Sequence, residues 1–233
     1  MDLGDILERA MGHAVGGSPP DVGRALAVAA ELTDGAPLPG GGRTAERWRL
    51  LAAMAAIDLT LARVVEAHVD AIAILAEAEG AGFVPKVGAD SPGATWGVFA
   101  AEGPGVVLTA RAFGDDWLLD GVKAWCSLAG RLSHALVTAR VEDGRRLFAV
   151  ALDHPGVHVL PDAWHARGLV DVPSGPVQFD SVPAWPVGDT GWYLRRPGFA
   201  HGGIGVAARL DVGEAPTYTS GRIPPIRLSG LEP

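Results

Sequence analysis

The sequence predicts an α+β protein in which an N-terminal helical region precedes an antiparallel β-sandwich or barrel. Three observations support this fold class. An Ala- and Leu-rich stretch with helical spacing comes first, the hydrophobic period changes near Ser91-Pro92-Gly93, and short β-branched or aromatic runs follow. We therefore expect a helical region over 1–90, a β-domain over 91–190 and a largely irregular segment over 191–233.

Two helical stretches are expected in the first region. The stretch 21–32 is rich in alanine and ends at Asp34-Gly35, and a loop rich in glycine and proline follows it. Thr44 is a candidate N-cap for a longer stretch whose apolar residues recur every three or four positions as far as Leu75. Two helices or one kinked helix satisfy this second pattern, so both remain open.

A series of short runs predicts the strands of the β-domain. They are rich in β-branched or aromatic residues, are bounded by Gly, Pro or Asp, and cover 95–101, 106–111, 117–125, 135–141, 147–152, 157–160 and 176–180. Asp143-Gly144 separates the fourth run from the fifth and predicts a hairpin with a type I′ turn. We expect these two runs to be antiparallel neighbours.

Composition and charge exclude several classes of protein. The 233 residues carry a formal net charge of −8, which argues against a nucleic-acid partner. The single cysteine excludes an internal disulfide and a cysteine-based zinc site, and it fits a reducing compartment. The acidic N-terminus lacks the basic flank and apolar core of a secretory signal, and charged residues interrupt the longest helical stretch. We expect a cytoplasmic protein without a membrane span.

The most informative stretch is Gly114-Asp-Asp-Trp-Leu-Leu-Asp-Gly-Val-Lys-Ala-Trp-Cys-Ser-Leu-Ala-Gly130, followed by Ala135-Leu-Val-Thr-Ala-Arg140. It resembles the middle β-domain signature of the acyl-CoA dehydrogenase family, with Gly121, Lys123, Trp125 and Ser127 at the motif positions. Weaker matches extend the resemblance over roughly 44–208; they include 66–71, 155–157, 167–168 and 177–183. The segment 101–105 matches the family pattern poorly.

The resemblance implies a flavoprotein of fatty acid metabolism. Such an oxidoreductase uses FAD to oxidise the CH–CH bond of an acyl-CoA thioester, and its flavin would be contacted by Trp125, Ser127 and the intervening Cys126. An indole clamps a flavin face by stacking, and a hydroxyl can donate a proton toward flavin N5. Strand alternation would turn the Cys126 side chain the other way, as a small buried residue. Without the resemblance, Trp125 would be a core aromatic and Ser127 a turn residue.

The resemblance also implies that part of the active site is missing. In the family, the catalytic glutamate and much of the pocket come from C-terminal helices and a second subunit. The segment 191–233 is interpreted as a remnant of that helical domain with an irregular tail, because its end is rich in Pro and Gly and has no helical period. Asp211 and Glu214 do not match the family base. No catalytic residue is assigned, and whether the chain alone is an enzyme stays open.

Several functional interpretations remain. The chain is an acyl-CoA dehydrogenase cut short near Ala208, a partial subunit that pairs with a helical partner, or a non-catalytic scaffold; a flavin-dependent monooxygenase of the same fold is a further alternative. We expect a homo- or hetero-oligomer in each case. No metal site is expected, because the histidines at 154, 158, 165 and 201 lack the spacing of helical ligands. The glycine-rich stretch 201–205 is interpreted as the start of a helix.

Overall fold

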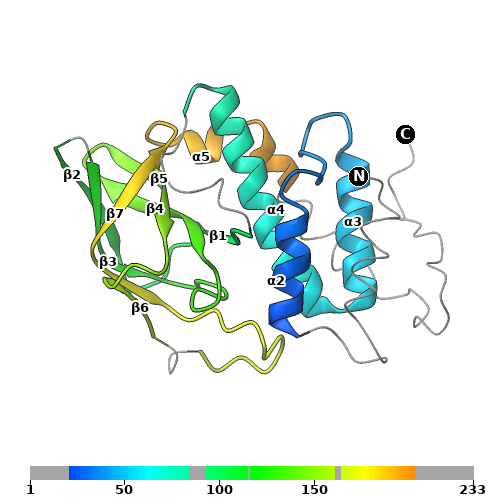
Figure 1. The fold of residues 1–233 in the computed structure, drawn as a ribbon. Coiled ribbons are helices and arrows are strands. Elements are labelled where there is room, and N and C mark those ends of the chain that lie inside the picture. Colours follow the sequence, from blue (N-terminus) through cyan, green and yellow to red (C-terminus); the bar gives the residue numbers. More distant parts are fainter. Residues whose placement is uncertain (1–20, 84–92, 115, 161–163, 203–233) are drawn as a thin grey trace. The chain divides into compact units, whose positions relative to one another are not determined.

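The computed structural model describes residues 21–83, 93–114, 116–160 and 164–202 (Figure 1). The chain divides into two compact units. One comprises Met1–Val69 with Pro197–Pro233, and the other comprises Asp70–Arg196. Helices precede a β-domain, so the α+β class is confirmed.

The first unit contains helix α2 (Val22–Glu31), helix α3 (Thr44–Ile57) and the first half of helix α4 (Leu59–Gly80). Asp21 caps α2, since its side chain accepts a 2.9 Å hydrogen bond from the Arg24 N–H. The prediction for Thr44 is wrong. The N-cap of α3 is Arg43, and the Thr44 hydroxyl instead accepts from the Gly40 N–H at 2.8 Å, which ties down the preceding loop.

Asp58 separates α3 from α4 and decides between two helices and one kinked helix. Its backbone is extended, with φ −164° and ψ 137°, so the helical path stops there. Its carboxylate accepts a 2.9 Å hydrogen bond from the Leu61 N–H and satisfies a donor at the start of α4. The stretch forms two helices.

His68 lies on α4 inside the helical unit and is fully buried. Its Nε2 lies 3.0 Å from the Thr33 hydroxyl, so the ring is hydrogen-bonded within the core. Burial lowers the pKa of His68 to about 4, because the charged imidazolium is poorly solvated there. His68 is a neutral core histidine at neutral pH.

The second unit is built around a seven-stranded sheet. Its strands are β1 (Trp96–Phe99), β2 (Leu108–Phe113), β3 (Asp116–Lys123), β4 (His134–Val141), β5 (Gly144–Ala151), β6 (Val157–Val159) and β7 (Val177–Val187). Neighbouring strands follow the order β1-β4-β2-β3-β7-β5, and β5 pairs back with β4, so the sheet closes into a barrel (Figure 1). Strand β6 lies beside β7.

The closed sheet is the barrel, which is one of the two expected architectures. The expectation of a purely antiparallel sheet is wrong. β4 pairs in parallel with β1 and with the Thr109 position of β2, while all other pairings are antiparallel. The fold is therefore a mixed β-barrel preceded by helices.

Two local predictions also need correction. The β4–β5 hairpin is present, but Val141 pairs with Gly144, so its loop is Glu142-Asp143. Asp143 does not have a positive φ, which excludes a type I′ turn. Strand β7 continues seven residues beyond its expected end, through Pro183 and Pro186, to Val187.

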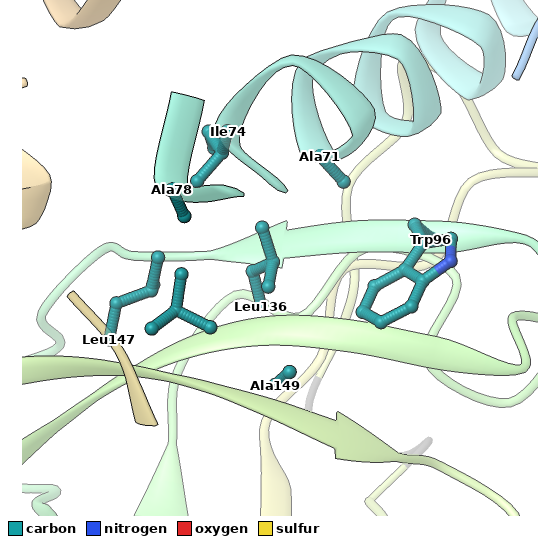
Figure 2. Close-up of a cluster of buried hydrophobic side chains, with 8 residues drawn as sticks. Ala71, Ile74, Ala78, Trp96, Leu136, Leu147 and Ala149 are labelled. Atoms are coloured by element: carbon teal, nitrogen blue, oxygen red, sulfur yellow. The ribbon is translucent and has the colours of Figure 1, made fainter. Parts of the chain in front are cut away.

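The core of the second unit includes a cluster from α4 and the barrel (Figure 2). Its fully or almost fully buried members are Ala71, Ile74 and Ala78 from α4 with Trp96, Leu136, Leu147, Ala149 and Val187 from the strands. The alanines allow a close approach of the helix to the barrel wall, as Figure 2 shows. A short helix, α5 (Trp192–Arg195), follows β7, and Arg196 then forms an ion pair with Glu77 of α4.

Candidate functional site

The candidate site is the loop 124–128, which leaves the end of β3. Burial alternates along it: Ala124, Cys126 and Leu128 are buried, whereas Trp125 and Ser127 are not. Trp125 and Leu128 have φ values of 54° and 60°, which side chains larger than glycine seldom adopt. The Cys126 side chain is thus in the core, whereas Trp125 is exposed and Ser127 is partly exposed.

A second segment, Pro173–Gly175, runs antiparallel to this loop. The Cys126 N–H donates to the Gly175 carbonyl at 2.9 Å, and the Leu128 N–H donates to the Pro173 carbonyl at 2.8 Å. These two bonds flank Ser127 and Ser174, which therefore face each other as a non-hydrogen-bonded backbone pair, where side chains approach most closely. The register is displaced by one residue from the β3–β7 pairing, in which Lys123 faces Val177.

The two serine hydroxyls are hydrogen-bonded. Ser127 Oγ and Ser174 Oγ are 2.8 Å apart, and either can be the donor. Ser174 Oγ also donates to the Val172 carbonyl at 3.2 Å. The pair is partly buried, so the Ser127 hydroxyl is held by the segment 173–175 and is not fully solvated.

Trp125 and Cys126 have opposite environments. The Trp125 side chain is 49% exposed, which is unusual for a large apolar ring on an ordered segment. Cys126 is 2% exposed, and its thiol donates to the Lys123 carbonyl at 3.4 Å. Burial raises the pKa of the Cys126 thiol to about 12. Cys126 anchors the loop from the inside.

Gly121 has a structural reason to be glycine. The β3–β7 register shifts between Leu119 and Gly121, and Gly121 takes a φ of 115°. A Cβ atom there would lie 2.3 Å from the Val107 carbonyl oxygen. Only glycine fits this irregularity, which lies just upstream of the candidate loop.

Lys123 is the buried cation of the site. Its side chain is 3% exposed, and its ammonium donates to Glu102 Oε1 at 3.1 Å and to the carbonyl and hydroxyl of Thr138 at 2.8 and 2.9 Å. Burial lowers the pKa of Lys123, and the Glu102 carboxylate opposes that effect. The ammonium joins the end of β3 to β4 and to the segment 101–105.

Glu102 receives a second cation, because Arg145 of β5 lies 3.3 Å from the same carboxylate oxygen. Burial raises the pKa of Glu102, but the donors Lys123 and Arg145 lower it overall. The next residue, Gly103, packs so closely that a Cβ atom there would lie 2.4 Å from the Ala124 Cβ. The segment 101–105, a poor match to the family pattern, is thus fixed beside the candidate loop.

The sequence analysis missed Ser174, Glu102 and Thr138. Thr138 lies inside an expected strand, but nothing local identifies it as the partner of Lys123. Ser174 lies in a short Pro- and Gly-containing stretch that carries no signal of a site. Residues 198–202 are helical, in keeping with a helix near His201, whereas Asp211 and Glu214 lie outside the described residues.

Two features are absent from the described ranges. No group of three or more His, Cys, Asp or Glu side chains there is placed to hold a metal ion. No helix in those ranges combines the length and the apolar character needed to cross a membrane.

Comparison with known proteins places the candidate site in a known domain. The sequence profile of "Acyl-CoA dehydrogenase, middle domain" matches residues 101–182, which contain every site residue named above. Over these residues the chain is similar to the middle domain of the acyl-CoA dehydrogenase family. A curated member, acyl-CoA dehydrogenase IpdE1 of Mycobacterium tuberculosis (strain ATCC 25618 / H37Rv), is 40% identical over 62 residues, which are 24% of this chain and 16% of that protein.

Solved structures share the acyl-CoA dehydrogenase fold. Glutaryl-CoA dehydrogenase from Mycobacterium smegmatis superposes with a TM-score of 0.63 at 21% identity, over 89% of this chain and 59% of that one. A further glutaryl-CoA dehydrogenase structure from this organism, in complex with FADH2, superposes with a TM-score of 0.59 at 18% identity. The match covers 90% of this chain and 62% of that one. Nitrososynthase from Micromonospora carbonacea var. africana superposes with a TM-score of 0.63 at 24% identity, over 90% of this chain and 60% of that one. The chain thus spans about three fifths of these structures.

Proposed function

We propose that this chain binds FAD at the loop 124–128 and forms the β-domain part of an acyl-CoA dehydrogenase-type oxidoreductase. The observation that carries the proposal is the half-exposed indole of Trp125, held at positive φ beside the Ser127 hydroxyl inside the matched domain. Strained backbone that presents a side chain outward is found at ligand sites more than elsewhere. The FADH2 complex of a protein with the same fold supports the choice of cofactor.

The side chains present fit a flavin. A planar apolar ring system requires a flat stacking surface, and Trp125 supplies one that is 49% exposed. The polar edge of the ring requires a hydrogen-bonding group on the same side, and Ser127 supplies it two residues later. Cys126 takes part only through its backbone position, because its thiol faces the core.

In the proposed mechanism, bound FAD supplies the capacity to accept a hydride from the substrate β-carbon. The residues of this chain do the positioning. Trp125 fixes one face of the ring system and excludes water from it, and Ser127 orients its edge. The bonds from Cys126 and Leu128 to the segment 173–175 hold both side chains at fixed positions. No base for the substrate α-proton is assigned among the described residues.

An acyl-CoA thioester is the proposed substrate, and a cytoplasmic homo- or hetero-oligomer is the proposed form. A flavin-dependent monooxygenase is the second candidate, because the nitrososynthase structure matches as well in fold as the glutaryl-CoA dehydrogenase does. Both candidates require the same flavin loop.

The experiment that tests the flavin loop is a calorimetric FAD titration of the full chain. Loss of the stacking surface in Trp125→Ala is expected to weaken FAD binding about ten- to hundredfold, the equivalent of burying and stacking one large ring. Phe113→Ala is the matched control, because Phe113 is an exposed aromatic (64%) on β2 of the same barrel. Equal affinity of the wild type and Trp125→Ala would show that the indole does not bind FAD.

A second experiment separates the two candidate activities. The FAD-loaded chain is mixed anaerobically with acyl-CoA thioesters of different chain lengths, and the flavin absorption band is recorded. A saturable spectral change supports a thioester site beside the flavin. No change, together with rapid reaction of the dithionite-reduced protein with oxygen, would favour the monooxygenase.

A further inference from the structure

We propose that Glu102 is a positioning residue of the candidate loop 124–128, because its carboxylate holds the end of β3 in the place that keeps the Trp125 indole exposed. This inference rests on the proposed flavin site and deepens it. Glu102 does not contact the flavin in this proposal. It acts through Lys123, the last residue of β3, which immediately precedes the loop.

Glu102 connects the start of the loop to the barrel through one oxygen atom. Glu102 Oε1 accepts a 3.1 Å hydrogen bond from the Lys123 ammonium and lies 3.3 Å from the Arg145 guanidinium on β5. The Lys123 ammonium also donates to the Thr138 carbonyl on β4 at 2.8 Å. One carboxylate thus ties the residue before the loop to two other strands.

The backbone on either side of Glu102 is also held. Before it, the Ala100 carbonyl accepts a 3.2 Å hydrogen bond from the Thr138 hydroxyl. After it, Gly103 lies so close to Ala124, the first residue of the loop, that a Cβ atom on Gly103 would come within 2.4 Å of the Ala124 Cβ. The carboxylate therefore acts on the loop from a segment that is itself fixed.

The loop needs an anchor at this end because of the Trp125 backbone. Its φ of 54° lies in the left-handed region, which is unfavourable for a residue with a side chain. Further along the loop, the Cys126 and Leu128 N–H groups are bonded to the segment 173–175. If Lys123 is released, we expect Trp125 to return to negative φ between the two anchors, and the indole then loses the position that binds the ring.

The exposed fractions of the two partners show why this ion pair has an effect. A pair between two exposed side chains contributes little. Here Glu102 is 43% exposed, but Lys123 is only 3% exposed. Water solvates an ammonium poorly at that depth, so loss of the carboxylate favours movement of the ammonium toward solvent. Such a movement displaces the residue before the loop.

The test compares FAD affinity with overall stability in two variants of the full chain. In Glu102→Ala we expect the dissociation constant of FAD to rise about threefold to thirtyfold, since a hydrogen bond to a buried charge is lost and the binding-competent loop is less populated. Asp120→Ala is the matched control, because Asp120 is 39% exposed and pairs with Arg111 on the same barrel. This control should lower the urea midpoint of unfolding and leave the dissociation constant unchanged.

Hydrogen exchange gives a readout that needs no flavin. Mass spectrometry follows the amides of peptides that cover the loop 124–128 and strand β4. We expect Glu102→Ala to speed exchange of the Cys126 and Leu128 amides about tenfold and to leave β4 unchanged, because only the loop opens. Exchange that rises equally in both peptides would show a general loss of stability and would overturn the proposal.

The remaining outcomes separate this proposal from the proposed function. An unchanged dissociation constant in Glu102→Ala, or an equal rise in Asp120→Ala, overturns the positioning role. If Glu102→Ala does not fold, Glu102→Gln keeps the side-chain volume and should weaken FAD binding in the same direction, because a neutral amide is a weaker acceptor. If the wild type binds no FAD, the proposed function fails, and the exchange rates alone decide the role of Glu102.

Discussion

Trp125 combines an exposed indole with a left-handed backbone conformation that is unfavourable for a residue with a side chain. A φ of 54° brings the Cβ of an ordinary residue close to its own backbone, and such residues cost about 1–3 kcal/mol. The neighbours impose the conformation: Ala124 and Cys126 are buried, and the Cys126 N–H is bonded to Gly175. Stability and ligand binding therefore make opposite demands at this position.

We expect Trp125→Gly to be more stable than Trp125→Ala by about 1 kcal/mol, since glycine relieves the strain that alanine retains. Trp117 of β3 provides the control. It lies within a strand without a positive φ, so Trp117→Gly should be less stable than Trp117→Ala. Urea unfolding of the four variants measures both differences. The same order at both positions would mean that the Trp125 backbone stores no strain.

Part of the site can be predicted from the sequence. Burial alternates from Ala124 to Leu128, and a period-two pattern is a local signal that the sequence carries. The partners cannot be found this way. Glu102, Thr138 and Ser174 lie 21, 15 and 47 positions from the residues they bind, and only the barrel pairing brings them together.

Strand β3 carries the irregularity that leads to the candidate loop. Gly121 accommodates it, and Lys123 then turns inward to the Thr138 carbonyl and hydroxyl on β4. The spacing of the motif thus follows from the register shift at Gly121, the buried ammonium of Lys123 and the exposed indole of Trp125. These positions are coupled through the path of a single strand.

Gly121→Ala is expected to lower the free energy of unfolding by about 2–3 kcal/mol, because the added methyl meets the Val107 carbonyl at a strained φ. Gly114→Ala is the matched control. Gly114 also has a positive φ, 62°, but a Cβ atom there meets nothing within 4 Å, so the cost should stay near 1 kcal/mol. Thermal unfolding followed by circular dichroism compares them. Equal losses of stability in the two variants would show that the Val107 carbonyl moves aside at no cost.

The existence of the elements follows from local sequence, whereas their pairing does not. Every expected strand forms, since apolar runs between turn residues are local signals. The parallel β1–β4 pair joins segments 38 positions apart and has no local signature. Strand β7 continues past Pro183, where a proline favours the prediction of a strand end because it cannot donate a ladder hydrogen bond. The break between α3 and α4 could not be predicted either, because the identity of Asp58 does not reveal its extended backbone.

The groups whose pKa values are shifted differ between the two units. The helical unit buries a neutral histidine, His68, whose pKa is lowered to about 4. The barrel carries carboxylates with lowered pKa: burial raises the pKa of Glu102 and Asp120, but hydrogen bonds to Lys123 and to Ser181 outweigh it. His134 of β4 also has a lowered pKa, because it is partly buried. Acid therefore acts on each unit through different groups.

The His68 contribution to stability is complete above pH 6.5 and is lost as the pH falls toward 4. The unfolded state binds the proton at pH values where the folded state does not, so unfolding becomes easier by up to about 3 kcal/mol. We expect urea unfolding at pH 7, 5.5 and 4 to show this decline and His68→Gln to flatten it. His165→Gln, which alters an exposed histidine, should keep the wild-type profile. An unchanged slope in His68→Gln would contradict the assignment.

Cys126 gives this chain a chemical reporter of the proposed flavin loop. It is the single cysteine of the sequence, and its thiol is shielded by burial and by a pKa of about 12. We expect a thiol reagent to reach it when the loop 124–128 separates from Pro173–Gly175, to which the Cys126 N–H is bonded. The rate of modification by such a reagent therefore counts the openings of that loop, with no engineered label. Any ligand that rests on the Trp125 face will register as a slower reaction at the sulfur behind it.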